Sequence, residues 1–363
     1  MLIYVVAGAR PNFVKIAPLL KALRLKKKNH KNLRFKLIHT GQHYDYNMSG
    51  TFFKELKIQK PNYFLNSNSG SHSKQTASVM LAFEKVLLNK KPSLVIVVGD
   101  VNSTMSCTIV AKKLNIPVAH IEAGIRSYDM TMPEEINRII TDSISDYFFT
   151  TTKEASQNLI NLNLPKKNVF FVGNTMIDSL YENLNKLIKP SFFLEKKLNK
   201  KCFFLLTIHR PSNVDDLLKL KKILKAIDKS SNNLPIVFPV HPRLKKKINK
   251  LNFSFKNIIF KNPLSYFEFL YLLKNSKGII TDSGGVTEEA TVLNIPCITL
   301  RENTERPETI KEGTNELVGD NLDLLIKKIK VILDDKWKNG KIPKLWDGKT
   351  SIRIVDIITK MKL

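Results

Sequence analysis

Short runs of apolar residues recur along this chain, and each is followed by a turn and an amphipathic stretch. In the first half, these runs cover residues 2–7, 34–39, 94–99, 117–121, 147–151 and 168–172. Continuous apolar runs are typical of strands buried on both faces, and their alternation with helices is typical of parallel sheets. The pattern therefore predicts an α/β fold built from βαβ units.

A charged stretch at residues 186–201 interrupts this rhythm, which then restarts. Further strands are expected near 202–207, 235–240, 257–260, 278–281 and 296–300, and an amphipathic helix at 349–361. A chain of 363 residues suits two domains better than one. We predict two doubly wound domains that face a cleft, residues 1–185 and 186–345, followed by a C-terminal helix in 346–363.

Composition excludes several classes of protein. No apolar run approaches the length of about 18 residues that indicates a membrane-spanning helix. The amino terminus reads as a buried strand and not as a signal peptide. Cys107, Cys202 and Cys297 are odd in number and far apart, which predicts neither a disulfide framework nor a zinc site. We expect a cytoplasmic protein without a metal and without a membrane partner.

The formal charge of +27 raises the question of nucleic-acid binding. The 59 basic residues include ten arginines, and the 49 lysines are scattered along the chain. Scattered lysines are typical of solvated helix faces, and no nucleic-acid motif or basic stripe with interleaved aromatic residues is present. We therefore expect no nucleic-acid partner.

The arginines are distributed differently from the lysines. Seven of them lie beside clusters of Gly, Pro, His and Glu: Arg10, Arg126, Arg138, Arg210, Arg243, Arg301 and Arg306. A guanidinium group binds carboxylates or phosphates through a planar fork that an ammonium group lacks. Chance and ordinary ion pairs could explain any single arginine, but seven together favour an anionic ligand.

Most of these clusters directly follow an expected strand. They are Gly8-Ala-Arg10-Pro, Gly99-Asp100, Glu122-Ala-Gly124-Ile-Arg126, Thr207-Ile-His209-Arg210 and Asp282-Ser283-Gly284-Gly285. Ligands of open α/β sheets bind outside the carboxyl ends of the strands. The shared placement therefore predicts a ligand site at these strand ends.

The 14 glycines contain no G-x-G pair, which excludes the dinucleotide fingerprint, and the P-loop is absent too. Ser283-Gly284-Gly285 precedes a helical pattern, where bare N–H groups and a hydroxyl suit a phosphate oxygen. A tight structural turn is the alternative. Glu288 and Glu289 would repel phosphate, but a carboxylate one turn further on could accept hydrogen bonds from two neighbouring sugar hydroxyls, so a nucleotide is indicated.

Pro133-Glu134-Glu135-Ile-Asn-Arg138 predicts the start of a helix, with proline first and acids in the first turn. Glu134 and Arg138 are four residues apart and share a face, which predicts an ion pair between them, whereas Glu135 points elsewhere. An ordinary surface pair is the alternative to a functional one.

Two histidines and one aspartate stand out in the remaining motifs. His120 and Glu122 lie two apart on a strand, but this pair is a weak metal motif without a third ligand. His209 follows a strand and is either a structural histidine or a functional one. Asp100, after Val-Ile-Val-Val-Gly, is the best isolated candidate for a carboxylate poised at a strand end.

Taken in order, these clusters resemble the non-hydrolysing UDP-N-acetylglucosamine 2-epimerase family over about residues 1–330. The matching stretches are Gly8-Ala-Arg10-Pro with Lys15, Thr40-Gly-Gln42-His43, Gly99-Asp100, Glu122-Ala-Gly-Ile-Arg126, Pro133-Glu-Glu-Ile-Asn-Arg138, Thr207-Ile-His209-Arg210, Asp282-Ser-Gly-Gly-Val-Thr-Glu-Glu289 and Arg301-Glu-Asn-Thr-Glu-Arg306-Pro-Glu. Each stretch alone is modest, whereas eight in the family's order are highly specific.

The resemblance implies a GT-B-like fold, with two Rossmann-like domains, a UDP-binding second domain and a C-terminal helix that returns to the first domain. It implies a homodimer and no nicotinamide or other cofactor. It also implies reversible inversion at C2 of UDP-N-acetylglucosamine, which gives UDP-N-acetylmannosamine. The family eliminates UDP to form a glycal and then adds it back.

Residue roles follow from the matching positions. The resemblance implies that Asp100, Glu122 and Glu134 form the acid/base set, that Arg138 aligns Glu134, and that His209 acts nearby. Substrate binding falls to Arg10, Lys15, Arg210, Phe269, Ser283, Gly284, Gly285, Glu289 and Arg306. Among these, Arg10, Ser283, Gly284 and Arg306 would hold the diphosphate, Glu289 the ribose and Phe269 the uracil.

Two alternatives stay open at this point. Relatives epimerise other UDP-sugars, including a diacetamido uronic acid, and a glycosyltransferase could use the same scaffold. Gln42 and His43 match part of an activator region of some bacterial members, but residues 69–75 lack the expected arginine. The Gly-Ala-Arg-Pro-Asn-Phe opening argues against the hydrolysing relatives.

Overall fold

The computed structural model describes residues 1–41, 53–67, 70–240, 242–251 and 253–361. The chain forms two compact units. Unit 1 comprises Met1–Glu182 and Lys344–Leu363, and unit 2 comprises Asn183–Pro343. In the described part of the chain, no helix is both long enough and apolar enough to cross a membrane.

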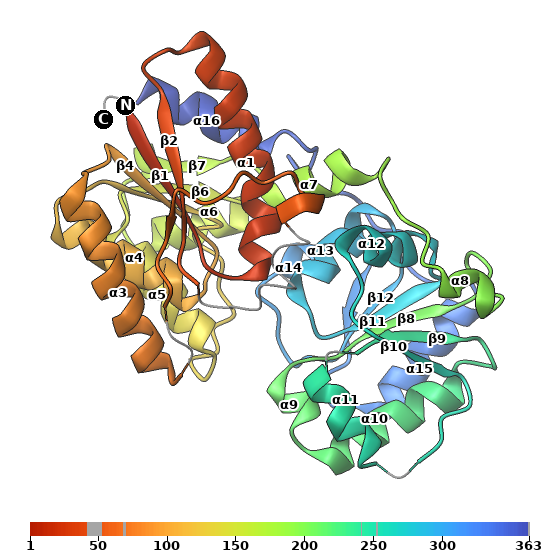
Figure 1. Ribbon diagram of the computed structural model, residues 1–363. Helices are drawn as coiled ribbons and strands as arrows, with labels where there is room; N and C mark the ends of the chain where they lie inside the picture. The colour runs from red at the N-terminus through yellow and green to blue at the C-terminus, as the bar shows by residue number, and fades with distance from the viewer. Residues whose placement is uncertain (42–52, 68–69, 241, 252, 362–363) are drawn as a thin grey trace. The chain divides into compact units, whose positions relative to one another are not determined.

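Unit 1 contains a seven-stranded sheet in the order β3-β2-β1-β4-β5-β6-β7, in which every pairing is parallel (Figure 1). Its strands are β1 (Leu2–Ala7), β2 (Arg34–His39), β3 (Tyr63–Phe64), β4 (Leu94–Val98), β5 (Val118–Ile121), β6 (Tyr147–Thr150) and β7 (Val169–Phe171). Its helices are α1 (Arg10–Asn29), α3 (His72–Asn89), α4 (Asn102–Lys113), α5 (Pro133–Ile144), α6 (Lys153–Asn161), α7 (Thr175–Asn183) and α16 (Thr350–Lys360), with a 3₁₀ turn at Lys166–Asn168.

Successive residues of β1 enter different cores, which explains why the strand reads as a continuous apolar run. Ile3 and Val5 pack in one core with apolar residues of α1 and α16, whereas Tyr4 and Val6 pack in another with α3 and α4. Side chains of a strand alternate between the two faces of a sheet, so both faces of β1 must be covered by helices.

Unit 2 repeats this plan with a six-stranded parallel sheet in the order β10-β9-β8-β11-β12-β13. Its strands are β8 (Phe204–Thr207), β9 (Ile236–Pro239), β10 (Ile258–Lys261), β11 (Gly278–Thr281), β12 (Cys297–Thr299) and β13 (Asn315–Leu317). Its helices are α8 (Phe192–Glu195), α9 (Pro211–Val214), α10 (Leu217–Ser230), α11 (Pro242–Asn249), α12 (Tyr266–Asn275), α13 (Gly284–Val292), α14 (Pro307–Lys311) and α15 (Leu322–Leu333).

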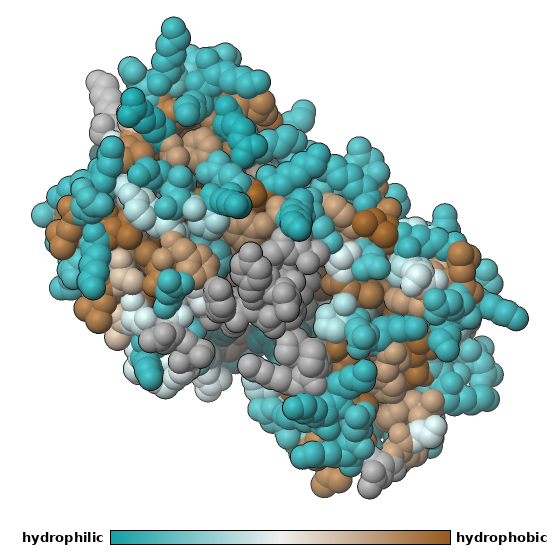
Figure 2. All heavy atoms as spheres, in the orientation of Figure 1, coloured by the Kyte–Doolittle hydropathy of each residue, from teal (hydrophilic) through white to brown (hydrophobic). Residues whose placement is uncertain are grey.

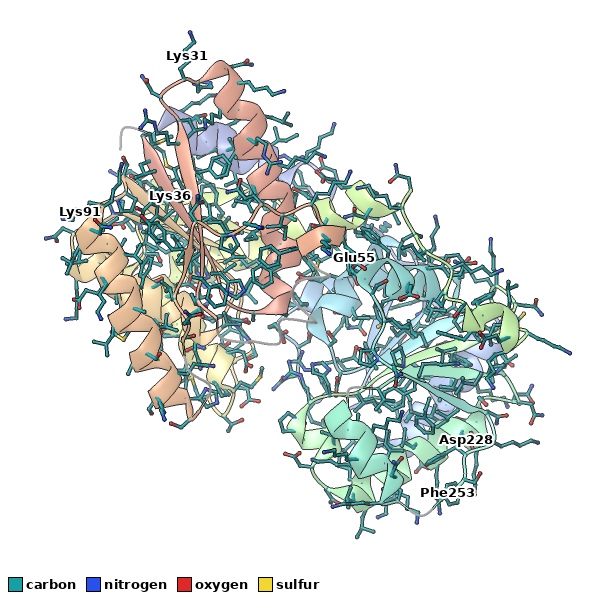
Figure 3. All side chains as sticks on the ribbon, viewed as in Figure 1. Lys31, Lys36, Glu55, Lys91, Asp228 and Phe253 are labelled. Carbon is teal, nitrogen blue, oxygen red and sulfur yellow. The ribbon has the colours of Figure 1, made fainter. Side chains whose placement is uncertain are left out.

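The predicted fold class, α/β with parallel Rossmann-like sheets, is confirmed. The predicted strands are present to within two residues, but the short strands β3 and β13 were missed. Hydrophilic side chains cover most of the visible surface in Figure 2. Lys31, Lys36 and Lys91 come from separate segments of unit 1 (Figure 3).

The C-terminal helix α16 is held on unit 1 by a buried aspartate of α7. The Asp178 carboxylate accepts hydrogen bonds from the backbone N–H groups of Thr350 (3.0 Å) and Ser351 (2.6 Å), which begin α16. Burial raises the pKa of Asp178, and these hydrogen bonds act against that rise. Trp346 lies just before the helix and donates its indole N–H to the Thr151 carbonyl.

We expect Asp178→Ala to destabilise the docking of α16 by about 2 kcal/mol, because two buried N–H groups lose their acceptor. Hydrogen exchange of the amides of residues 350–358 measures this local opening. The matched control is Asp356→Ala, which removes a partly exposed ion pair with Lys26 and should cost at most about 1 kcal/mol. Equal exchange in the two variants would contradict the anchoring role of Asp178.

Candidate functional site

The first group of candidate residues surrounds the point in unit 1 where the sheet order reverses, between β1 and β4. Loops at such a point diverge and leave room for a ligand. The Asn12 side chain accepts from the N–H groups of Gly8 and Ala9 after β1 and donates to the Val98 carbonyl of β4. A Cβ on Gly8 would lie 2.3 Å from Ser103 Oγ, so only glycine fits this turn.

A buried ion pair joins α1 to the end of β5. Lys15 Nζ donates to Glu122 Oε2 at 2.7 Å, and both side chains are almost fully buried. Glu122 has a φ of 70°, a left-handed conformation that is uncommon outside glycine and costs free energy. The pairing with Lys15 allows an ionised carboxylate to stay buried here. This pair lies beside Gly99, where a Cβ would be 3.4 Å from Lys15 Nζ.

Arg138 on α5 links two further carboxylates. Its Nε lies 3.2 Å from Asp100 Oδ2, and its Nη1 lies 2.5 Å from Glu135 Oε2. Glu135 also accepts from the backbone N–H groups of Ser127 and Tyr128. The Asp100 side chain is partly exposed, unlike that of Glu135, so it is the one accessible to a ligand.

One predicted contact of α5 is wrong. Arg138 pairs with the buried Glu135, three residues earlier, and not with Glu134. Glu134 is partly exposed in the first turn of the helix. Residues three and four apart both lie near one another on a helix, and the burial of Glu135 selects the shorter spacing. The catalytic role of Glu134 stays a prediction.

His120 does not form a metal site with Glu122. Its ring nitrogens contact the Asp142 carboxylate and the Gly99 carbonyl, whereas Glu122 contacts Lys15. In the part of the chain that the structure describes, no group of three or more His, Cys, Asp or Glu side chains could hold a metal ion.

The second group surrounds the equivalent reversal in unit 2, between β8 and β11. The buried Asp282 carboxylate accepts from the backbone N–H groups of His209 and Arg210 and from the Asn213 amide. Its Oδ1 lies 2.7 Å from His209 Nδ1. Burial alone would raise the pKa of Asp282, but His209 and the backbone donors together lower it.

His209 is therefore oriented by an ionised aspartate. Its side chain is 61% exposed, so Nε2 faces outward from the Asp282 contact. Arg210 donates through Nε to the Asp282 carbonyl at 3.1 Å. An imidazole held by a carboxylate in a fixed orientation is suited to proton transfer or to binding an anion.

The helix α13 begins at Gly284, directly after Ser283. The first N–H groups of a helix lack intrahelical partners and bind anions readily. Arg301 lies beside this end: its Nη2 contacts Glu305 at 2.6 Å, and its buried Nη1 has no partner among the residues that the structure describes. A Cβ on Gly284 would lie 2.6 Å from Glu305 Oε1, so the Glu305 carboxylate packs closely against this glycine.

Arg306 and Glu289 have buried partners that the sequence motifs did not predict. Arg306 Nε lies 2.5 Å from Oε1 of the fully buried Glu288. The Tyr266 hydroxyl donates to Glu289 Oε1 at 2.8 Å. Burial and the neighbouring Glu288 raise the pKa of Glu289 to about 8, although the Tyr266 hydrogen bond acts to lower it. Phe269 lies on the same helix as Tyr266 and is partly buried.

The structure thus places the predicted residues in two groups. Arg10, Lys15, Asp100, Glu122, Glu134 and Arg138 belong to unit 1, and His209, Arg210, Phe269, Ser283, Gly284, Gly285, Glu289 and Arg306 belong to unit 2. Gln42, His43, Ser69 and His241 lie outside the described residues. Asp282 and Arg301 belong to the sequence motifs, but no individual role was predicted for either. No sequence pattern indicated Tyr266.

The sequence profile of the family described as UDP-N-acetylglucosamine 2-epimerase matches residues 25–359. The chain is 43% identical to the UDP-N-acetylglucosamine 2-epimerase of Methanocaldococcus jannaschii, with 99% of each chain covered. It is 37% identical to the UDP-2,3-diacetamido-2,3-dideoxy-D-glucuronate 2-epimerase of Pseudomonas aeruginosa, over 99% of this chain and 100% of that one. The crystal structure of the M. jannaschii enzyme with UDP-GlcNAc and UDP superposes with a TM-score of 0.88 at 42% identity, over 99% of this chain and 100% of that one.

Proposed function

The chain belongs to the UDP-N-acetylglucosamine 2-epimerase family, and on that premise we propose that it interconverts UDP-N-acetylglucosamine and UDP-N-acetylmannosamine. Its similarity to curated relatives identifies it as a non-hydrolysing UDP-sugar 2-epimerase. The observation that carries the choice of chemistry is the pair of carboxylates after β4 and β5, Asp100 and Glu122, each held by its own cation.

The reaction must invert a carbon that has no adjacent carbonyl group, so direct removal of the C2 proton is very costly. We propose an elimination in which a base takes the C2 proton and the C1–O bond breaks. The electron pair of that bond leaves with UDP, and a C1=C2 double bond forms in the sugar. UDP then adds back to C1 while an acid delivers a proton to the opposite face of C2.

Asp100, Glu122 and Glu134 are the acid/base groups in this proposal. Lys15 Nζ contacts Glu122, and Arg138 Nε contacts Asp100. A cation beside a carboxylate favours the ionised form, which is the form that acts as a base.

Unit 2 is proposed to bind UDP. The start of α13 at Ser283, Gly284 and Gly285 would hold the diphosphate through backbone N–H groups. Arg301 adds a buried guanidinium nitrogen beside Gly284, and Arg210 and Arg306 of the same unit add positive charge to this anion-binding site. Arg10 of unit 1 keeps its proposed diphosphate role from the motif correspondence alone. Preorganised donors of this kind stabilise the charge that develops on the departing diphosphate.

The nucleoside would lie further along α13 and α12. Glu289 is suited to accept from the ribose hydroxyls, and Phe269 to pack against uracil. His209, held by Asp282, would face the diphosphate through Nε2. These roles depend on the motif correspondence together with the contacts of each side chain.

The test is incubation of the protein with UDP-N-acetylglucosamine alone in deuterated water. We expect both epimers at equilibrium, with deuterium at C2 and the nucleotide still attached. Turnover only after addition of an acceptor would favour a glycosyltransferase, and conversion only of UDP-2,3-diacetamido-2,3-dideoxy-D-glucuronate would favour the chemistry of the Pseudomonas relative.

In the same assay, Asp100→Asn and Glu122→Gln should each lower kcat by about 10²- to 10⁴-fold, because each amide removes a proton-transfer group. The variants keep the size of the side chain, and their folding can be checked by circular dichroism. Asp320→Asn, on the exposed pair with Lys219 in unit 2, is the control. Near-normal turnover in either site variant would remove that residue from the acid/base set.

Binding of UDP should release close to one proton per site at pH 7. The raised pKa of Glu289, about 8, keeps its carboxyl protonated in the free protein at that pH, whereas ribose hydroxyls favour the ionised acceptor. Affinity should therefore rise with pH up to about 8. Calorimetry in two buffers of different ionisation enthalpy measures the proton count, and Glu289→Gln should show no release. Equal proton counts for the two proteins would contradict the ribose role.

A homodimer is part of the proposal, and the surface of unit 1 offers a face for it. Leu81 and Leu88, seven residues apart on α3, are 64% and 68% exposed, and hydrophobic side chains lie among hydrophilic ones over α3 and α4 in Figure 2. Light scattering should give a dimer for the native chain and a monomer for Leu81→Glu/Leu88→Glu. A dimer in both would exclude this face, and a native monomer would exclude the dimer.

A further inference from the structure

His120 is fully buried on β5, and both of its ring nitrogens face oxygen atoms. Nδ1 lies 2.7 Å from Asp142 Oδ1, and Nε2 lies 2.9 Å from the carbonyl oxygen of Gly99. The exposed fraction of each side chain of the His120–Asp142 pair is 0%, so water does not compete for these bonds.

Both oxygens act as acceptors. Asp142 is ionised because its other oxygen accepts from Arg126 Nη1 at 2.6 Å and from the Gly124 N–H at 3.1 Å. Burial alone would raise the pKa of Asp142, but His120 and Arg126 together lower it. The Gly99 carbonyl has only lone pairs to offer.

A neutral imidazole can donate from one nitrogen only. The other nitrogen would then present a lone pair to an oxygen less than 3 Å away, which is repulsive in a site that water cannot screen. The geometry is satisfied only when both nitrogens carry a proton. The charges facing His120 are those of Asp142 on α5 and, through it, Arg126 after β5.

The Gly99 peptide is the point on which this bond acts. Gly99 has a φ of 69° and donates its own N–H to the Ile121 carbonyl. With the His120 bond, both its N–H and its C=O are held by β5. The next residue is Asp100, whose carbonyl accepts from Asn137 and whose carboxylate contacts Arg138.

We propose that His120 is a positioning residue that donates from both ring nitrogens and fixes the Gly99–Asp100 turn through the Gly99 carbonyl. This inference rests on the proposed acid/base role of Asp100. A histidine that only filled space would not need a second ring proton, and its replacement would not change the rate of the chemical step.

The protonation state is tested directly in the native protein. With selectively ¹⁵N-labelled histidine at neutral pH, we expect both ring nitrogens of His120 to show the signature of protonated nitrogens, each coupled to a hydrogen. His120→Gln assigns the resonance by its loss. A single unprotonated ring nitrogen would overturn the proposal, whatever the variants do.

The positioning role is tested by the kinetics of His120→Gln. We expect kcat to fall between about tenfold and a hundredfold, because a misplaced catalytic group lowers the chemical step, with KM for UDP-N-acetylglucosamine unchanged. His30→Gln, at the exposed end of α1, is the control. A native kcat in a folded His120→Gln protein would overturn the positioning role.

The two proposals fail in different ways. If Asp100→Asn keeps native turnover, the acid/base role of Asp100 is wrong, while the nitrogen signature of His120 is unaffected. If His120 shows one unprotonated nitrogen while Asp100→Asn is inactive, only the present inference is wrong.

Discussion

Three buried glutamates in this protein each have a partner of opposite charge. Removing one carboxylate from water costs several kcal/mol unless a cation or several donors replace the lost hydration. Glu122, Glu135 and Glu288 have Lys15, Arg138 and Arg306 as their respective partners. Because the Lys15–Glu122 pair joins α1 to the end of β5, the bond that stabilises the charge also connects two distant loops. The same ion pair therefore stabilises the buried charge and holds the two loops together.

Glu289 differs from these three glutamates, and its pKa shows the effect of burial beside a neutral partner. Its hydrogen-bond partner, Tyr266, is neutral, and its neighbour Glu288 is already committed to Arg306. Without a cation, burial raises the pKa of Glu289 to about 8. This is the behaviour that low-dielectric surroundings impose on a carboxyl group.

The two units solve the problem of joining strand ends in a similar way. In each, the first turn of the helix after the central strand carries an asparagine, Asn12 or Asn213, whose amide donates to a carbonyl at the end of another strand of the same sheet, β4 for Asn12 and β12 for Asn213. The apolar runs predicted these strands because parallel strands are buried on both faces. The strands β3 and β13 were not predicted because β3 has only two residues and β13, Asn-Glu-Leu, is not an apolar run.

Contacts between distant segments could not be read from the sequence. Helix spacing allowed Arg138 to meet either glutamate of its helix, and only the burial of Glu135 decided between them. The strand alternation that paired His120 with Glu122 ended at Ile121, because the φ of Glu122 is positive. Asp142 lies 22 residues after His120, and no local pattern connects them. The motifs predicted which loops contain the site residues, whereas the partner of each side chain depends on tertiary packing.

The return of α16 to unit 1 has a consequence for the order in which the chain acquires its structure. Unit 2 is one continuous segment, whereas unit 1 needs residues from both ends of the chain. During synthesis, α16, which covers β1 together with α1, emerges from the ribosome after unit 2, so part of the apolar surface of the earlier half stays uncovered until then. The inserted half can finish folding before the half that precedes it.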